Sequence, residues 1–597
     1  MIDQAKSIPS PQRYLLHLAK SHPTFRIAEL DSCACLYGFG IRLLATGDHY
    51  ISGAYQPSSS NWGHELGSTS ELEDAIGQGD SALLVIEFTT GQGVYKDSQS
   101  ACVPVVDTQK TDDWARLLTQ RCILVKSISH LFSPIPSSPN YKHLHDYMTP
   151  RRELWQRNED EQKEFAFNLT GINKKIGFPR QRETIEGFAF MDLTSKINLK
   201  KPEVTYMLFE ECKSSRHEDS SLDVDNLDSD TVAKGKAKLE EAVEGVKPLR
   251  VFMGSLVAYG QARQLVYKFA VKDRKFFGNT SMESEMSLLM AGQTLADQGK
   301  LVYDPFAGTG SLLYVCANWG SYVMGSDIDG RQMRGKGRQM CSVGRRPSDV
   351  LIELPRVILD KTGPGVFRAA NQYGVRDKVL DCLTFDVTRN PWRRGEVLDA
   401  IITDPPYGVR AGAKRLGRKE GGKKKQILEP VKLPNGLWSH EMPGYIPASR
   451  PYEMVDLVYD LVVFARYMLV PGGRLVFFLP TFTEEWDPVD VPVVEGMREI
   501  SFGQGSAQDY NKWSRRLITL EKVKVVDEEG KAKKWDAPTF VPLEADFTGM
   551  AINDGDVSGE EDAGPRKGQK LPGHANFRDK YLAGFPSSAP STPPLRD

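Results

Sequence analysis

The chain has 597 residues, of which 40% are hydrophobic and 26% charged, with a formal net charge of -2. This composition is typical of soluble globular proteins, and the length predicts more than one domain. No apolar stretch is long enough to span a bilayer and no secretory signal is evident, so we expect neither a membrane protein nor a secreted one. Eight scattered cysteines without a C-x-x-C pair predict no metal site and a reducing, cytoplasmic compartment.

Residues 1–145 mix helix and strand signals and form the first predicted domain, an α+β region. The segments 81–89 and 122–125 carry apolar and β-branched residues between polar turns, which is typical of strands. This region shows no cluster of ligand residues and no nucleophile beside an obvious base. Its sequence therefore assigns it no chemistry.

The second predicted domain covers residues 146–248, with strands expected at 165–169 and 205–210. Basic residues lie between and around these strands: Arg151, Arg152, Lys174, Lys175, Arg180, Arg182, Lys196, Lys200 and Lys201. A solvated surface explains any one of them, but the group also suits phosphate contacts, which position RNA without reading its sequence. Residues 213–248 are polar, acidic and nearly free of aromatics, which indicates a flexible insertion.

The third predicted domain covers residues 249–525. It begins with a strand expected at 264–271 and a helix expected to start at Thr280, which has capping-box spacing from Glu283. Strand-like apolar runs then alternate with a helical pattern, at 301–304, 322–326, 379–382 and 398–403. This alternation predicts an α/β fold with a Rossmann-like, doubly wound parallel sheet.

Each of these four strands is followed closely by an acidic residue: Asp304, Asp327, Asp386 and Asp404. Ligands of open parallel sheets collect beyond the carboxyl ends of the strands. We therefore expect the four carboxylates to lie at the same edge of the sheet and to define the binding site.

The first loop reads Asp304-Pro305-Phe306-Ala307-Gly308-Thr309-Gly310. Its glycines leave room where the backbone turns tightly and a ligand approaches. The loop lacks both the G-x-G-x-x-G of dinucleotide sites and the lysine of a P-loop, which favours a phosphate-free cofactor such as S-adenosylmethionine. Asp327 would then accept hydrogen bonds from the ribose hydroxyls, and Asp386 from the adenine amino group.

The second motif is Asp404-Pro405-Pro406-Tyr407. An exocyclic amine on a base is a poor nucleophile, so an enzyme must hold it in line and accept its N–H bonds. Asp404 and the Pro405 carbonyl can accept those bonds, the prolines fix the turn, and Tyr407 offers a face for stacking. In isolation a structural Pro-Pro turn explains the motif almost as well, but the preceding cofactor signals favour methyl transfer to an amine.

The remaining segments carry less chemistry. Residues 411–426, rich in Lys, Arg and Gly, predict a loop that is either solubilising or RNA-facing. A long amphipathic helix is expected at 452–469, with strands at 474–479 and 517–520. Residues 526–597 are charged and then rich in Pro and Ser, which indicates a disordered, non-catalytic tail.

Taken together, residues 304–310, the Asp404 motif and residues 278–282 resemble the catalytic subunit of the tRNA guanine-10 N2-methyltransferases. Segments 123–128 and 511–517 are more discriminating matches, and the resemblance covers most of residues 10–525. The acidic insertion after Cys212 and the basic insertion after Arg410 depart from the family pattern.

The resemblance implies a ferredoxin-like part at 1–145, a THUMP domain at 146–248 that grips the tRNA acceptor end, and a methyltransferase domain at 249–525. It implies S-adenosyl-L-methionine as cofactor and a small zinc-binding activator subunit as partner in a heterodimer. It assigns the target guanine amine to Asp404, Pro405, Pro406 and Tyr407. It assigns the cofactor to Asp304, Phe306, Ala307, Gly308, Thr309, Gly310, Asp327 and Asp386.

Two alternatives stay open. The chain can be an amino-methyltransferase with another planar acceptor, such as adenine N6 or a protein glutamine, because the Asp404 motif suits each of these. It can also be a non-catalytic RNA-binding protein that kept the fold. The extra N-terminal region and the basic segments favour structured RNA, whereas the intact Asp404 and loop glycines argue against loss of catalysis.

Overall fold

The computed structural model divides into two compact units, Met1–Val266 and Tyr267–Asp597, and each is considered by itself. It describes residues 11–44, 81–96, 103–135, 137–212, 248–278, 280–335, 365–393, 395–408, 412–416, 432–438, 442, 449–482, 491–500, 506–510, 513–526, 530, 531, 533, 535, 574, 577 and 581. Almost all of the predicted acidic insertion and most of the basic insertion and tail lie outside these residues. Among the described residues, no helix combines the length and apolar character needed to cross a bilayer.

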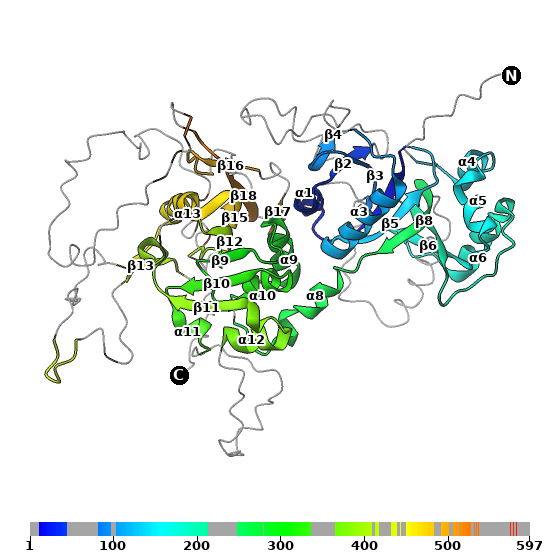
Figure 1. Ribbon diagram of the computed structural model, residues 1–597. Helices are drawn as coiled ribbons and strands as arrows, with labels where there is room; N and C mark the ends of the chain where they lie inside the picture. The colour runs from blue at the N-terminus through cyan, green and yellow to red at the C-terminus, as the bar shows by residue number, and fades with distance from the viewer. Residues whose placement is uncertain are drawn as a thin grey trace, which may run out of the picture. The chain divides into compact units, whose positions relative to one another are not determined.

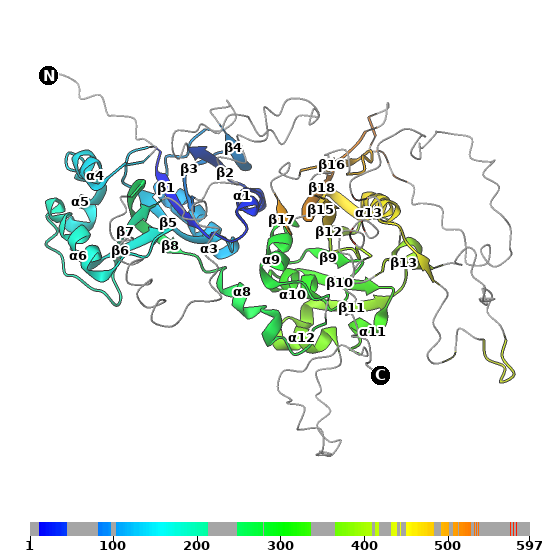
Figure 2. The same ribbon diagram turned by 180° about the vertical axis from the view of Figure 1, so that it is seen from behind.

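One eight-stranded sheet organises the first unit, in the order β4-β2-β3-β1-β5-β8-β7-β6 (Figures 1 and 2). Its strands are β1 (Arg13–Leu18), β2 (Gly40–Leu44), β3 (Leu83–Thr89), β4 (Gly93–Lys96), β5 (Val125–Leu131), β6 (Phe165–Ile172), β7 (Val204–Glu211) and β8 (Arg250–Tyr259). The longer helices are α1 (Arg26–Tyr37), α3 (Thr108–Arg121), α4 (Tyr141–Met148), α5 (Glu153–Asp160) and α6 (Phe178–Glu186). The expected α+β class of this region is confirmed.

Strand β8 ties the first unit together. It pairs antiparallel with β5 on one side and with β7 on the other, so strands from both predicted N-terminal domains share one sheet. Residues 250–259 were expected to open the methyltransferase domain, yet their hydrogen bonds are made in the first unit. The division between the units therefore falls after β8.

A second sheet organises the second unit, in the order β11-β10-β9-β12-β15-β18-β16, with β17 beside β18. Its strands are β9 (Leu301–Asp304), β10 (Tyr322–Asp327), β11 (Val379–Thr384), β12 (Leu398–Thr403), β15 (Leu469–Phe482), β16 (Met497–Glu499), β17 (Ala507–Asp509) and β18 (Trp513–Lys522). Strands β11, β10, β9, β12 and β15 run parallel, whereas β18 is antiparallel to its neighbours. The predicted Rossmann-like, doubly wound sheet is confirmed, and its strand order reverses between β9 and β12.

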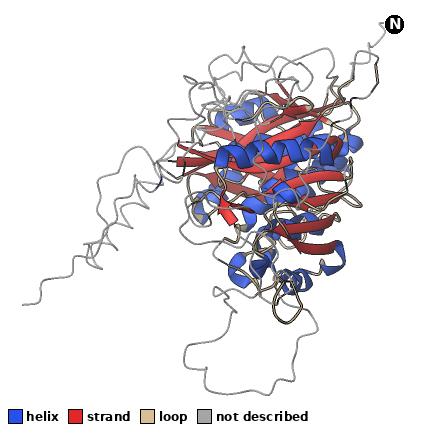
Figure 3. Cartoon of the chain, turned by 90° about the vertical axis from the view of Figure 1, so that its left-hand side faces the viewer, coloured by secondary structure: helices blue, strands red, loops and turns tan. Residues whose placement is uncertain are grey.

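Helices cover both faces of this second sheet because alternate residues of each strand point to opposite sides. Helix α13 (Met454–Met468) packs on one face, where Leu457 lies in a core with Ile401 and Phe477. Helix α9 (Ser284–Gln293) covers the other face, where the Gln293 side chain accepts from the Thr519 hydroxyl at 2.5 Å. Helix α10 (Ser311–Asn318) lies beside α9 in both views (Figures 1 and 2). Figure 3 distinguishes helices and strands by colour.

Residues 264–271 do not form the expected strand. They fold as helix α8 (Gln264–Lys268) followed by a 3-10 turn at Val271–Asp273. The segment has the apolar pattern of a strand, but within the described part of the chain it pairs with no strand of either sheet. Its backbone N–H groups bond locally instead, for example Leu265 N to the Ala262 carbonyl at 3.0 Å.

The expected helix start at Thr280 is also wrong by several residues. Helix α9 begins at Ser284, and its N-cap residue Glu283 makes no side-chain capping bond. Thr280 donates instead to the Gln332 side chain at 3.2 Å, a contact from a distant part of the chain. Residues 280–283 thus precede α9 rather than forming its first turn.

Candidate active site

The glycine-rich loop joins the end of β9 to the start of α10. Gly308 and Gly310 have φ values of 50° and 82°, in the left-handed region that favours glycine. A Cβ built on Gly310 would lie 2.9 Å from the Tyr314 hydroxyl, so the position also lacks space for a side chain. An alanine there costs roughly 1–2 kcal/mol in backbone strain alone. The loop conformation therefore depends on glycine at this position.

A layer of polar contacts supports this loop. The Tyr314 hydroxyl donates to the Thr309 carbonyl at 2.7 Å, and the Thr309 and Ser281 hydroxyls share a hydrogen bond at 2.8 Å. The buried guanidinium of Arg274 donates to the Ser311 hydroxyl at 2.7 Å, at the first residue of α10. Sequence reasoning gave no role to Arg274 or Ser281. Ser281 belongs to residues 278–282, which match the family but did not indicate this contact, whereas Arg274 lies before that match.

Asp327 ends β10 directly beside the glycine-rich loop. Its Oδ2 accepts from Gly308 N at 3.0 Å, and its Oδ1 accepts from Asp329 N at 2.8 Å. Burial raises the pKa of Asp327 to about 6, although these two N–H bonds oppose the shift. The structure thus brings Asp327 to the loop, as the spacing of one βαβ unit predicts.

Asp304 joins the carboxyl ends of two adjacent strands. Its Oδ1 accepts from the Thr403 hydroxyl of β12 at 2.8 Å and from Phe306 N at 3.0 Å. The side chain is only 1% exposed, and burial raises its pKa to about 7. Asp304 therefore sets the relative position of the two loops that begin at residues 304 and 404. The neighbouring carboxylates of Asp327 and Asp404 raise its pKa further.

Asp386 follows β11 and is buried. Its Oδ1 accepts from the backbone N and the hydroxyl of Thr388, both at 2.9 Å, and its Oδ2 accepts from Leu416 N at 2.5 Å. Leu416 ends β13 (Lys414–Leu416), a short strand paired with β14 (Ser449–Pro451). This part of the basic insertion is therefore not the expected loop, because Asp386 and β14 fix its backbone.

The Asp404 motif begins where β12 ends. The Tyr407 hydroxyl donates to Asp404 Oδ1, and the Arg515 guanidinium lies 3.6 Å from Asp404 Oδ2. Burial raises the pKa of Asp404, while Arg515 and the Tyr407 bond lower it. Burial and the adjacent carboxylate raise the pKa of Tyr407 well above its usual value, which keeps its hydroxyl protonated as a donor. The Asp404 side chain is 28% exposed, so its oxygens remain accessible to a substrate.

Arg515 is the member of this cluster that sequence reasoning missed. It lies on β18, its Nε donates to Gln508 Oε1 at 2.7 Å, and its guanidinium lies 4.4 Å from the Phe478 ring centroid. Gln508 donates in turn to Glu283 Oε1 at 2.9 Å. These contacts hold Arg515 beside Asp404. Arg515 lies within residues 511–517, which match the family. That match did not show that this segment forms a strand beside β15 and brings Arg515 to Asp404.

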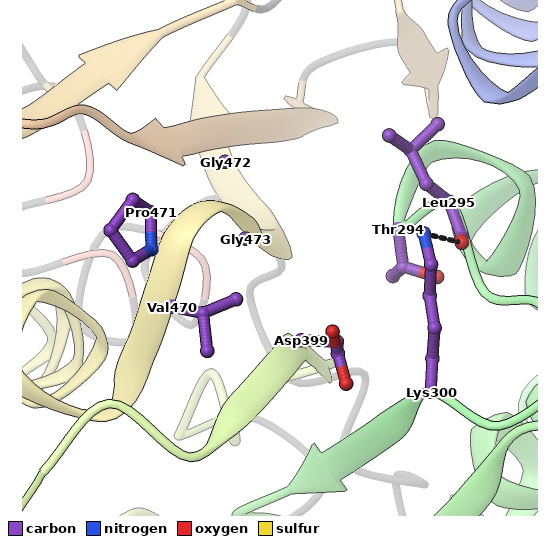
Figure 4. Close-up of a pocket in the computed structure, with 8 residues that line it drawn as sticks. All are labelled: Thr294, Leu295, Lys300, Asp399, Val470, Pro471, Gly472 and Gly473. Atoms are coloured by element: carbon purple, nitrogen blue, oxygen red, sulfur yellow. Dashed lines mark hydrogen bonds between the residues drawn. The ribbon is translucent and has the colours of Figure 1, made fainter.

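A small hollow elsewhere in the second unit is not part of this site. Its lining residues are Thr294, Leu295, Lys300, Asp399, Val470, Pro471, Gly472 and Gly473 (Figure 4). Lys300 precedes β9, and Asp399 lies at the start of β12, so the hollow lies at the amino ends of the parallel strands. Its polar groups are engaged locally, as Lys300 Nζ donates to the Leu295 carbonyl at 2.8 Å (Figure 4). The candidate site lies at the opposite, carboxyl edge.

The arrangement at the carboxyl edge suits a reaction that needs positioning rather than covalent chemistry. A glycine-rich loop and Asp327 form one half of the site, and Asp404 with Tyr407 forms the other. Asp304, the last residue of β9, accepts hydrogen bonds from Thr403 of β12 and from Phe306 N in the glycine-rich loop, and so links the halves. An accessible carboxylate oxygen beside a tyrosine ring can bind a planar group that bears N–H donors.

Two family models match the chain. Residues 87–225 match the Tmrp11 THUMP N-terminal domain, and residues 272–419 match the RMKL-like methyltransferase domain. The tRNA (guanine(10)-N(2))-methyltransferase TRMT11 of Bos taurus is 31% identical over 576 residues, covering 96% of this chain and 95% of that protein. The tRNA (guanine(10)-N(2))-methyltransferase of Schizosaccharomyces pombe is 28% identical, covering 97% and 98%. Among solved structures, TrmN from Thermus thermophilus is 14% identical with a TM-score of 0.34, covering 86% of this chain and 100% of that one.

The raised pKa values of Asp304 and Asp327 predict how the binding of S-adenosylmethionine depends on pH. Both carboxyls become ionised as pH rises through about 6 to about 7. Because the sulfonium is cationic, calorimetric titration should show its affinity rising from about pH 5 to about pH 8. S-adenosylhomocysteine lacks the sulfonium charge and is the control, with a smaller rise expected. Equal pH dependence for both ligands, or tighter binding of S-adenosylmethionine at low pH, would contradict the prediction.

Proposed function

The chain belongs to the tRNA (guanine(10)-N(2))-methyltransferase family, and from this premise we propose that it methylates the exocyclic N2 amine of guanine 10 in tRNA, using S-adenosylmethionine. The observation that carries the proposal is the geometry of Asp404. Its carboxylate stands at the end of β12, partly accessible, and is held by the Tyr407 hydroxyl and Arg515. Such an acceptor, one strand away from a glycine-rich cofactor loop, suits a planar amine.

The residues at the loop fit the cofactor. Gly308 leaves open space on the loop, since a Cβ built there would meet no atom closer than 3.8 Å. Phe306, Ala307, Gly308, Thr309 and Gly310 would line the cofactor, and Asp327 would accept from its ribose hydroxyls. Asp304 would support the loop from below, and Asp386 would lie near the adenine. When bound, S-adenosylmethionine supplies an electrophilic methyl group on a cationic sulfur.

Asp404 and the Pro405 carbonyl would accept the two N–H bonds of the target amine and hold its nitrogen in line with the methyl group. As the nitrogen gains the methyl group it loses a proton. Asp404 can accept this proton because burial already raises its pKa. Arg515 acts through Asp404 by fixing its orientation, and Pro406 stiffens the turn. The Tyr407 ring would stack on the base while its hydroxyl stays bonded to Asp404.

The target base has to leave its stack to reach this site, so contacts elsewhere must hold the tRNA. We propose that the THUMP-containing first unit supplies them. Four of its predicted basic residues form ion pairs within the unit: Arg152, Arg180, Arg182 and Lys196. Lys175, Lys200 and Lys201 are exposed and remain suited to phosphate contacts.

We further propose that a small zinc-binding activator subunit binds the chain as a heterodimer, and that the chain acts in the cytoplasm. The first proposal rests on the family resemblance alone, and the second on the scattered cysteines, which indicate a reducing compartment. Methyl transfer measured with and without the co-expressed activator tests the first. A chain that is equally active and equally soluble alone would remove the need for that partner.

Asp404→Ala should lower kcat for tRNA methylation by roughly 100-fold or more, because it removes the acceptor for the target amine. The dissociation constant of S-adenosylmethionine should change less than about threefold, since Asp404 lies outside the proposed cofactor residues. The assay is transfer of a labelled methyl group to unmodified tRNA, followed by nucleoside analysis. Asp377→Ala, an exposed aspartate of the same unit, is the matched control. Equal loss of methylation and cofactor binding would give Asp404 a cofactor or structural role.

The double variant Lys200→Ala/Lys201→Ala should weaken tRNA binding several-fold and reduce the slope of log affinity against log salt by about 1.5 to 2. Both side chains are exposed, so the effect on folding should be small. Lys196→Ala is the control, because the Lys196 ammonium already lies 2.6 Å from Glu164 Oε1. Filter binding across a salt series measures both quantities. An unchanged slope in the double variant would remove these lysines from the RNA interface.

A further inference from the structure

Three described residues near the end of the chain depart from the expectation of a disordered, non-catalytic tail. His574 and Phe577 are 1% and 2% exposed, and Tyr581 is half-buried. Their spacing of three and four residues is that of one face of a helix. Phe577 N donates to the His574 carbonyl at 3.3 Å, which is consistent with a local turn. We call these three residues the C-terminal anchor.

The anchor lies against the edge of the sheet that carries the candidate site. The Phe577 ring centroid is 5.3 Å from that of Phe482 and 5.6 Å from that of Trp513. Phe482 and Trp513 are directly paired across β15 and β18, so Phe577 packs over a cross-strand pair. Tyr581 extends the contact, with its ring 6.0 Å from Trp513. Burial of the Phe577 ring among other aromatic rings stabilises this contact.

Phe577 also reaches the Asp404 motif itself. Its ring lies 6.4 Å from that of Tyr407, at an interplanar angle of 80°, the edge-to-face arrangement that aromatic pairs favour. Tyr407 is the residue whose hydroxyl bonds to Asp404. A fixed Tyr407 ring therefore fixes one of the two contacts that orient the Asp404 carboxylate.

The second group that contacts Asp404 is the Arg515 guanidinium, and it is also connected to this aromatic cluster. Trp513 stacks on Tyr510 at 4.4 Å and 16°. The Tyr510 hydroxyl donates to Gln508 Oε1 at 2.8 Å, and this oxygen also accepts from Arg515 Nε. Phe577 thus contacts Tyr407 directly and is connected to Arg515 indirectly, through Trp513, Tyr510 and Gln508.

We propose that the C-terminal anchor is part of the acceptor site and that Phe577 is a positioning residue, which holds the Tyr407 ring for stacking on the target base. The proposal rests on the proposed methyl transfer and extends it to a segment more than 160 residues beyond the Asp404 motif. The ring contacts of Phe577 are made with Tyr407, Phe482, Trp513 and Tyr581, which lie outside the glycine-rich loop, so cofactor binding should not depend on it.

Full-length Phe577→Ala, Phe577→Leu and wild type are compared with Val526→Ala, which truncates an exposed apolar side chain of the same unit. The measurements are kcat and KM for unmodified tRNA, the dissociation constant of S-adenosylmethionine, and Tm. Phe577→Ala should lower kcat on the order of 10- to 100-fold, because a loosened Tyr407 misplaces the acceptor. Its KM and cofactor affinity should stay close to those of Val526→Ala, whereas its Tm should fall because a buried ring is removed. Phe577→Leu should recover part of kcat by restoring apolar volume.

Each other outcome overturns the proposal. An unchanged kcat would make the anchor irrelevant to the reaction, and a raised kcat would make it an inhibitory cover of the base site. Parallel loss of kcat, cofactor binding and Tm would make it a structural element only. An inactive wild type that still binds S-adenosylmethionine, when assayed with the proposed activator subunit present, would instead refute the proposed tRNA methylation, and this inference would fall with it.

Discussion

The orientation of one carboxylate, that of Asp404, is the constraint on which the rest of this site depends. A carboxylate that contacted only solvent would rotate freely, and it would lose conformational entropy when a substrate bound. Here Oδ1 accepts from the Tyr407 hydroxyl and Oδ2 faces the Arg515 guanidinium at 3.6 Å. The partial exposure of Asp404 leaves room for a further donor. A site that is ordered before the substrate arrives needs little reorganisation during the reaction.

The parallel sheet brings this acceptor to the cofactor loop. Strands β9 and β12 are hydrogen-bonded neighbours, so the loops that follow them emerge side by side. The bond between the Thr403 hydroxyl and Asp304 then fixes their spacing at the last residue of each strand. The glycine-rich loop is held from the opposite side by Asp327 at the end of β10. The fold thus gathers several carboxylates where a cationic cofactor is proposed to bind, and their mutual repulsion is relieved when it binds.

Much of this organisation follows from local sequence patterns. Apolar runs bounded by turns located β9, β10, β11 and β12, and the rule for parallel sheets placed Asp304, Asp327 and Asp404 at one edge. The failures share one physical cause, which is that distant partners decide the outcome. Residues 264–271 have a strand pattern but find no neighbouring strand. Arg515 reaches Asp404 only because β18 returns antiparallel beside β15, and no local pattern encodes that pairing. Phe577 lies in a polar, proline-rich tail. The average composition of this tail gives no indication that one of its rings packs against β15 and β18.

The central claim is that the acceptor is the exocyclic amine of guanine 10, and one substitution in the RNA tests it most directly. Inosine in place of guanosine at position 10 removes that amine and preserves the rest of the base. Two otherwise identical unmodified tRNAs, differing at this position, are incubated with labelled S-adenosylmethionine and the chain, with the proposed activator subunit present. The account predicts N2-methylguanosine from the guanosine-10 tRNA and background incorporation for the inosine-10 tRNA. Equal methyl incorporation into both would place the acceptor elsewhere and contradict the account.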